Sequence, residues 1–225
     1  MSREARRWLK VAVWAVCLSP LAMLLYQLWT DDLGANPIAY VTAVLGETTL
    51  RILLASLATT PLRILFGISW QMSLRRLLGL FAFFYAVLHF GVWVVLDHFF
   101  DWPPMLADIA KRPYITVGMT ALVLLVPLAL TSTTGMIKRI GGKNWQRLHR
   151  LVYVIGILGV LHFLWLAKKG RQEPYYYAIV LALLLGVRVW DRGQAFLRKR
   201  QLLGRRVPSA SRLPLGESSE RLSTD

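Results

Sequence analysis

The sequence predicts an all-α integral membrane protein, a bundle of six transmembrane helices with both termini in the cytoplasm. Of its 225 residues, 56% are hydrophobic and 17% are charged, whereas soluble domains carry about 25% charged residues. The single cysteine, Cys17, lies in an apolar run, which excludes a disulfide framework or a cysteine-ligated metal site. Each of six apolar stretches is long enough to form a helix across the bilayer, and they lie at 11–28, 40–66, 77–99, 114–130, 148–166 and 175–190.

The first stretch follows a basic cytoplasmic segment, residues 1–10, and is longer than the apolar core of a signal peptide, about 7–15 residues. We therefore interpret it as an uncleaved span, with Trp8 and Trp29 as anchors at the two membrane interfaces. The last stretch is followed by a basic segment that becomes rich in Ser, Arg and Pro. We expect residues 194–225 to be a disordered cytoplasmic tail, so that residues 11–193 form one six-span domain.

The basic residues are distributed unequally between the two sides of the predicted bundle. The terminal segments and the two loops on their side carry 19 Lys and Arg residues, and the three opposite loops carry five. The positive-inside rule therefore places both termini in the cytoplasm. This topology accounts for the net charge of +15 without a nucleic-acid partner, because the basic residues flank spans and do not alternate with stacking aromatic residues.

The second span contains Glu47 and Arg51, which are four residues apart and therefore share one helix face. One interpretation is an ion pair between them near the outer interface. The other is that Arg51 meets an anionic group of a cofactor, such as a heme propionate.

Two histidines stand 13 residues apart on the fifth span. A helix would separate His149 and His162 by roughly 20 Å along its axis, which places them at two depths in the bilayer. Ligating side chains inside a span are rare and usually functional. The pattern therefore favours two stacked hemes, although 13 residues turn a helix by about 220°, so the two side chains do not share a face.

His89 on the third span matches His162 in depth. It lies ~18 Å from the inner edge of its span, and His162 lies 14 residues past Leu148. We expect the two imidazoles to face each other and to hold a low-spin, six-coordinate heme that transfers electrons. The alternative for each histidine is a hydrogen-bonded side chain that serves helix packing.

His149 has no histidine partner at its own depth. Arg76 and Arg75 precede His89 by 13 and 14 residues, and an arginine there would pair with a propionate or approach the iron only under unusual conditions. We therefore expect an inner heme, if present, to be held by His149 with a weak, water or absent second ligand. The fourth histidine, His98, is interpreted as an interfacial polar side chain and not as a ligand.

Motifs for hydrolysis or phosphoryl transfer are absent from the sequence: it has no G-x-S-x-G, P-loop or HExxH. The chain also has no soluble domain large enough for NAD(P)H or a Rossmann flavin site. If the protein moves electrons, other molecules must supply and accept them.

Several segments resemble the MsrQ family, also called YedZ, over about residues 8–195. The resemblance implies a bacterial inner-membrane b-type cytochrome of the ferric-reductase-like superfamily, with heme ligands at His89, His149 and His162. The related oxidases have two histidines on each of two spans and this chain has one on its third span, which leaves the number of hemes at one or two. The matching segments are 60–63 (TPLR), 75–89 (RRLLGLFAFFYAVLH), 111–116 (KRPYIT), 130–132 (LTS) and 145–153 (WQRLHRLVY).

The resemblance also implies partners. MsrQ proteins pass electrons to MsrP, a periplasmic molybdopterin enzyme that reduces methionine sulfoxide in oxidised proteins, and they draw them from the quinone pool or a cytosolic flavin reductase. This chain would then be the electron-transfer subunit and not the sulfoxide reductase. An FMN is also attributed to the family. The sequence has a basic cytoplasmic rim that could hold the phosphate of a flavin, although the positive-inside rule explains these residues as well: Arg63, Arg75, Arg76 and Arg150.

Two other functions stay open at the level of sequence. One is a ferric or cupric reductase that uses the same hemes, and the other is a non-redox transporter or scaffold whose histidines serve protonation or packing. The outer segment Asp97–Pro113 is expected to be irregular. Its acidic and aromatic side chains would dock the partner, or the segment would simply cap the bundle.

Overall fold

The computed structural model describes residues 2–167 and 170–205, and every regular element in them is helical, which confirms the predicted all-α class. The chain divides into two compact units, Met1–Arg188 and Val189–Asp225. The helices are α1 (Arg3–Trp29), α2 (Pro37–Phe66), α3 (Arg75–Val92), α4 (Trp102–Lys111), α5 (Pro113–Leu130), α6 (Thr134–Ile140), α7 (Gly142–Leu148), α8 (Leu151–Leu166) and α9 (Glu173–Arg205), with a 3-10 turn at Trp70–Ser73 and a π-helical turn at Trp93–Asp97.

Five helical stretches in the described residues are long and apolar enough to cross a membrane, and they coincide with the first five predicted spans. The predicted sixth span, 175–190, lies in α9 but is not among them. The sixth span and the cytoplasmic position of both termini stay predictions. The five stretches are Glu4–Trp29, Pro37–Phe66, Arg75–Asp97, Pro113–Leu130 and Gly142–Leu166.

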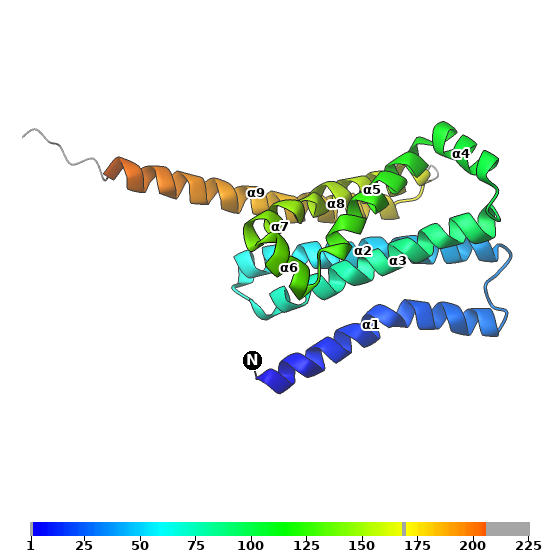
Figure 1. The fold of residues 1–225 in the computed structure, drawn as a ribbon, viewed down its shortest axis with the longest axis horizontal. Helices are drawn as coiled ribbons and strands as arrows, with labels where there is room; N and C mark the ends of the chain where they lie inside the picture. Colours follow the sequence, from blue (N-terminus) through cyan, green and yellow to red (C-terminus); the bar gives the residue numbers. More distant parts are fainter. Residues whose placement is uncertain (1, 168–169, 206–225) are drawn as a thin grey trace, which may run out of the picture. The chain divides into compact units, whose positions relative to one another are not determined.

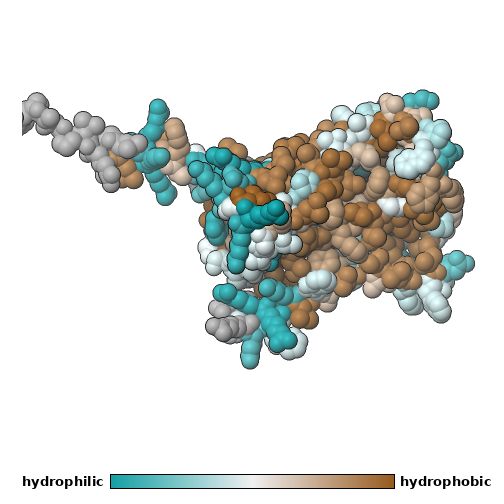
Figure 2. Space-filling view, in the orientation of Figure 1, coloured by the Kyte–Doolittle hydropathy of each residue, from teal (hydrophilic) through white to brown (hydrophobic). Residues whose placement is uncertain are grey.

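Four helices form the centre of the first unit. α2 packs along α3 and α5 packs along α8, while contacts of α3 with α5 and of α2 with α8 join the two pairs (Figure 1). Side chains from all four meet in a buried cluster that includes Leu53, Phe81, Leu125 and Ile155. The flank of the unit visible in Figure 2 is a broad hydrophobic band between more hydrophilic ends, as expected for a surface that contacts lipid.

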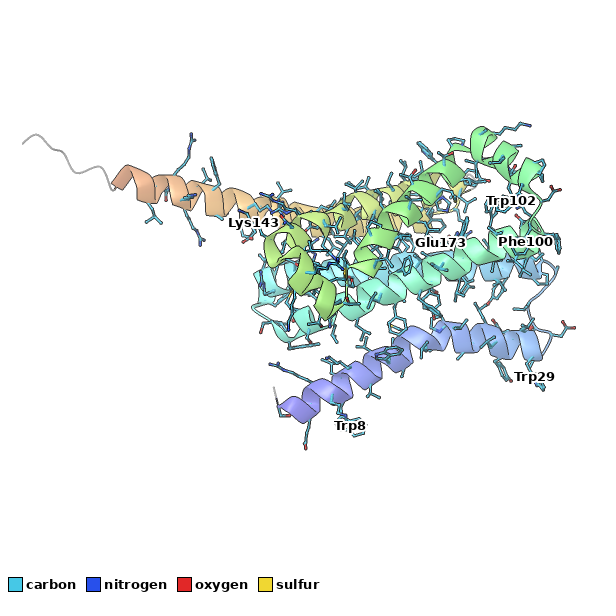
Figure 3. All side chains as sticks on the ribbon, in the orientation of Figure 1. Trp8, Trp29, Phe100, Trp102, Lys143 and Glu173 are labelled. Atoms are coloured by element: carbon cyan, nitrogen blue, oxygen red, sulfur yellow. The ribbon has the colours of Figure 1, made fainter. Side chains whose placement is uncertain are left out.

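The two ends of the first unit are distinguished by the residues that lie at each. Trp29, Trp102 and Glu173 lie at one end, which we call the outer end, and Trp8 and Lys143 lie at the other, the inner end (Figure 3). The charge distribution predicts that the inner end faces the cytoplasm.

A hydrogen bond between helices ties α1 to α3. Pro20 lies inside α1, where it cannot donate an N–H to the helix. Next to this interruption, the Ser19 hydroxyl donates to the carbonyl of Val16 at 2.9 Å. The hydroxyl of Tyr85 in α3 donates to the carbonyl of Cys17 at 2.6 Å, and Tyr85 is completely buried.

Replacing Tyr85 with phenylalanine is expected to lower the free energy of unfolding by about 1 kcal/mol, because it removes this buried hydrogen bond and keeps the ring. Thermal unfolding of the detergent-solubilised protein measures the change. Tyr175→Phe, at an exposed position, is the matched control. Equal unfolding temperatures for the two variants would contradict the prediction.

Two parts of the chain that were expected to be irregular or disordered contain helices. The outer segment forms α4, which starts at Trp102 and has prolines in its first turn, where a proline favours helix initiation. The expectation of an irregular Asp97–Pro113 segment was therefore wrong for α4. α9 continues to Arg205, so residues 194–205 of the expected disordered tail are helical. The rest of the expected tail, 206–225, lies outside the described residues.

Candidate functional site

A cavity of about 530 Å³ lies between α2, α3, α5 and α8, toward the outer end. Its size is within the range of small-molecule and cofactor sites. The wall is mostly apolar and includes His89 from α3 and His162 from α8. Four charged residues complete the wall near the outer end: Glu47, Asp97, Arg112 and Arg171.

His89 and His162 face each other across this cavity, as expected from their similar predicted depths. Their ring centroids are 6.2 Å apart and the ring planes are 83° to each other. A bond from a metal to an imidazole nitrogen is about 2 Å long, so one metal ion between two imidazoles places the ring centroids roughly 6 Å apart. The observed separation therefore fits a single iron between the two rings.

The hydrogen bonds of the two rings determine which nitrogen is available to a metal. Nδ1 of His89 lies 2.9 Å from the carbonyl oxygen of Thr42 in α2, and Nδ1 of His162 lies 2.6 Å from that of Tyr114 in α5. Because a carbonyl oxygen only accepts, each Nδ1 carries the proton in the neutral ring. Each Nε2 then keeps its lone pair, which is the arrangement found in metal-ligating histidines.

Two glycines leave room for the imidazoles. A Cβ at Gly46 would lie 2.9 Å from Cε1 of His89, and a Cβ at Gly118 would lie 2.7 Å from Nδ1 of His162. Cβ atoms do not approach other atoms this closely without displacement. The backbones of α2 and α5 therefore approach the two rings in a way that a side chain at either glycine would prevent.

The residues of this cavity fit a heme. They offer two opposed imidazoles with free Nε2 atoms, an apolar wall for the macrocycle and guanidinium groups near the outer end for its propionates. Such an arrangement favours electron transfer, because both axial positions of the iron would be filled by the protein.

Arg51 has a different position. Its guanidinium forms the predicted ion pair with Glu47 at 2.7 Å and donates to the hydroxyl of Tyr177 at 2.8 Å. It is not among the residues described as lining the cavity. Arg171 instead lines the wall and pairs with the other oxygen of Glu47 at 3.2 Å.

His149 lies at a break between α7 and α8, so the predicted fifth span is not one continuous helix. Its ring stacks on Trp145, with centroids 3.9 Å apart, and its Nε2 lies 3.1 Å from the hydroxyl of Thr131. The same hydroxyl is 2.6 Å from the carbonyl of Pro127, to which it donates. It therefore accepts from His149, whose Nε2 carries the proton here.

The four arginines of the predicted cytoplasmic rim all lie at the inner end. Arg63 is in the last turn of α2, Arg75 and Arg76 begin α3, and Arg150 joins α7 to α8. Arg75 is half-buried, and the other three are exposed.

His98 packs against the ring of Trp93 at the outer end, with centroids 4.6 Å apart. Its Nδ1 lies 3.6 Å from Asp97 and its Nε2 lies 3.4 Å from Asp108 in α4. It is not among the residues that line the cavity, in keeping with its interpretation as an interfacial side chain.

Sequence reasoning missed several residues of this site. Thr42 and Tyr114 act through backbone carbonyls, and Gly46 and Gly118 act through the absence of a side chain, so their residue types gave no chemical signal. Arg112 and Tyr114 do lie within the segment 111–116 that carries the family resemblance.

The chain is similar to known membrane proteins. Residues 41–160 match the family model described as the ferric reductase like transmembrane component. The chain is 50% identical over 190 residues to the protein-methionine-sulfoxide reductase heme-binding subunit MsrQ of Ralstonia nicotianae, covering 83% of this chain and 87% of that protein. It is 50% identical over 198 residues to the MsrQ protein of Herminiimonas arsenicoxydans (87% and 91% covered), and 53% identical over 180 residues to that of Rhodospirillum rubrum (80% and 86% covered).

Proposed function

Because this chain belongs to the MsrQ family of ferric-reductase-like transmembrane proteins, we propose that it is the b-type cytochrome of a methionine sulfoxide reductase system in the bacterial inner membrane. It carries electrons across that membrane to a periplasmic molybdopterin enzyme, MsrP, which reduces methionine sulfoxide. The observation that carries this proposal is the His89–His162 pair, 6.2 Å apart across an apolar cavity.

The residues around the cavity have distinct tasks in this function. His89 and His162 would hold the iron of heme b through Nε2, and the carbonyls of Thr42 and Tyr114 orient the two rings. The bound heme supplies a one-electron iron centre. The apolar wall would keep water away from it. Because both imidazoles would be ligands of the iron, the site would favour electron transfer over reduction of a bound molecule.

The proposed topology places electron entry and electron exit on opposite sides of the membrane. We place the outer end in the periplasm and both termini in the cytoplasm, with α9 providing the sixth span through 175–190. MsrP then docks at the outer end, where α4 and its neighbours present exposed Phe99, Phe100 and Trp102. Electrons enter from the quinone pool or a cytosolic flavin reductase, and the arginine rim at the inner end would hold the phosphate of an FMN.

An inner heme at His149 would require a change in the hydrogen bonds of that histidine. In the structure, Nε2 of His149 already donates to Thr131, so an iron there would require Nδ1 or the exchange of this hydrogen bond. Arg75, at the start of α3 at the inner end, would suit a propionate better than an iron.

Replacing His149 with alanine tests this second site. If His149 holds an inner heme, the heme content per polypeptide should fall by about half, while the low-spin signal of the His89–His162 heme should persist. Heme quantification with absorbance spectroscopy measures both, and His98→Ala is the control. Unchanged stoichiometry and spectrum would mean that His149 has no heme.

The spectrum of the purified protein tests the proposed function itself. A reduced-minus-oxidised difference spectrum should show b-type heme bands, and reduced protein should be reoxidised by MsrP together with methionine sulfoxide. Absence of the bands would favour the transporter or scaffold alternative. Reoxidation of the reduced protein by ferric or cupric salts, but not by MsrP with methionine sulfoxide, would favour a metal reductase.

A further inference from the structure

Two guanidinium groups lie at the outer opening of the cavity. Of the cavity-lining residues that the structure describes, Arg112 and Arg171 are the two arginines. Arg112 directly precedes α5, and Arg171 lies two residues before the start of α9. Both side chains are about half exposed, at 53% and 46%, so they lie where the apolar cavity meets the aqueous boundary.

Arg112 is linked to the imidazole on one side of the cavity. Its Nη1 donates to the hydroxyl of Tyr114 at 3.4 Å, and the carbonyl of the same tyrosine lies 2.6 Å from Nδ1 of His162. Its Nε pairs with Asp108 of α4 at 3.3 Å. These contacts hold the guanidinium beside the residue that orients His162.

Arg171 is linked to both sides of the cavity. Its guanidinium lies over the ring of Phe163, 5.9 Å from the centroid, and Phe163 follows His162 in α8. It also pairs with Glu47 at 3.2 Å, and Glu47 follows Gly46, whose backbone lies against His89. Its Nε pairs with Glu173 at 2.5 Å.

A heme between His89 and His162 must place its two propionates somewhere. They are its anionic groups, and burying either in the apolar part of the wall without a partner would be strongly unfavourable. The opening offers two guanidinium groups for two carboxylates, and arginine binds carboxylates with strong, directional hydrogen bonds.

We infer that Arg112 and Arg171 bind the two heme propionates, and that Glu47 positions Arg171 for this contact. The inference rests on the proposed heme between His89 and His162. Arg51, for which the sequence predicted this contact, pairs with the same Glu47 but does not line the cavity. The matched control is Lys111, an exposed cation next to Arg112 that is not among the described lining residues and does not pair with Glu47.

Reconstitution with two hemes tests the inference. The full-length protein is depleted of heme and titrated with protoheme or with its dimethyl ester, whose propionates carry no charge, while the low-spin absorbance is followed. The unmodified protein should bind protoheme at least about tenfold more tightly than the ester, because only protoheme forms the charge-assisted hydrogen bonds. The Arg112→Gln/Arg171→Gln double variant should lose this preference and still bind the ester normally.

Three further results make the outcome decisive. Lys111→Gln should keep the full preference for protoheme. Each single variant, Arg112→Gln or Arg171→Gln, should reduce it and shift the midpoint potential to more negative values, because a cation beside the heme favours the reduced state. A double variant that keeps the full preference would overturn the inference and leave the heme site intact. Failure of the unmodified protein to give a low-spin spectrum with either compound would instead overturn the heme site itself.

Discussion

Replacing His162 with alanine is expected to abolish the low-spin heme signal of the purified protein. The imidazole of His162 is one of the two that face each other across the cavity, 6.2 Å apart, and no other histidine lines it. An iron left with His89 alone would lose its sixth ligand, so the remaining heme should be high-spin and bound more weakly. Heme content per polypeptide and the absorbance spectrum measure the effect, and His89→Ala should behave in the same way.

The control for these variants is His98→Ala, which changes a histidine at the outer end that does not line the cavity. It should keep the low-spin signal. Adding imidazole to a His162→Gly variant should restore part of that signal, because a free imidazole can occupy the space of the lost ring. If His162→Ala kept the normal spectrum and heme content, the histidine would serve packing only.

The second large effect is expected from one added methyl group. In Gly118→Ala, the new Cβ would lie 2.7 Å from Nδ1 of His162, where that nitrogen already contacts the carbonyl of Tyr114 at 2.6 Å. The ring must move and its hydrogen bond must weaken. Overpacking of this kind costs about 1–3 kcal/mol, which corresponds to roughly 5–150-fold weaker heme binding if the whole cost falls on the bound ring.

Heme titration of the depleted protein measures this change, and Gly91→Ala is its control. Gly91 lies in α3, two residues after His89, and a Cβ there would meet nothing within 4 Å. Alanine also has the higher helix propensity, so this variant should bind heme normally and be as stable as the unmodified protein or more so. Equal heme affinity for the two variants would contradict the prediction for Gly118.

The pairing of His89 with His162 was predictable because the rise per residue of a helix is nearly constant. Counting residues from the inner edges of two spans gives their depths, and two ligating side chains at one depth can meet if their helices are neighbours. The ion pair of Glu47 with Arg51 followed in the same way from their spacing within one helix, and the structure confirms it at 2.7 Å. The role of Arg51 toward a propionate stays a prediction.

The partners of the imidazoles were not predictable by counting. The carbonyls of Thr42 and Tyr114 are 47 and 48 residues away from the histidines that they contact, and every residue in a helix has such a carbonyl. Arg171 likewise reaches Glu47 across 124 residues. The sequence also did not predict the break between α7 and α8 at His149, because the apolar pattern continues through it.

The sequence by itself determined the helical membrane class, the five apolar spans and the depth of each histidine, because hydropathy and helical rise are local properties of the chain. Only the tertiary structure decided which side chains meet. Helix rotation and tilt depend on packing between α2, α3, α5 and α8, and this packing brings Gly46 and Gly118 against the two imidazoles and places Arg112 and Arg171 at the opening of the cavity. These contacts join segments far apart in the chain, and no local pattern records them.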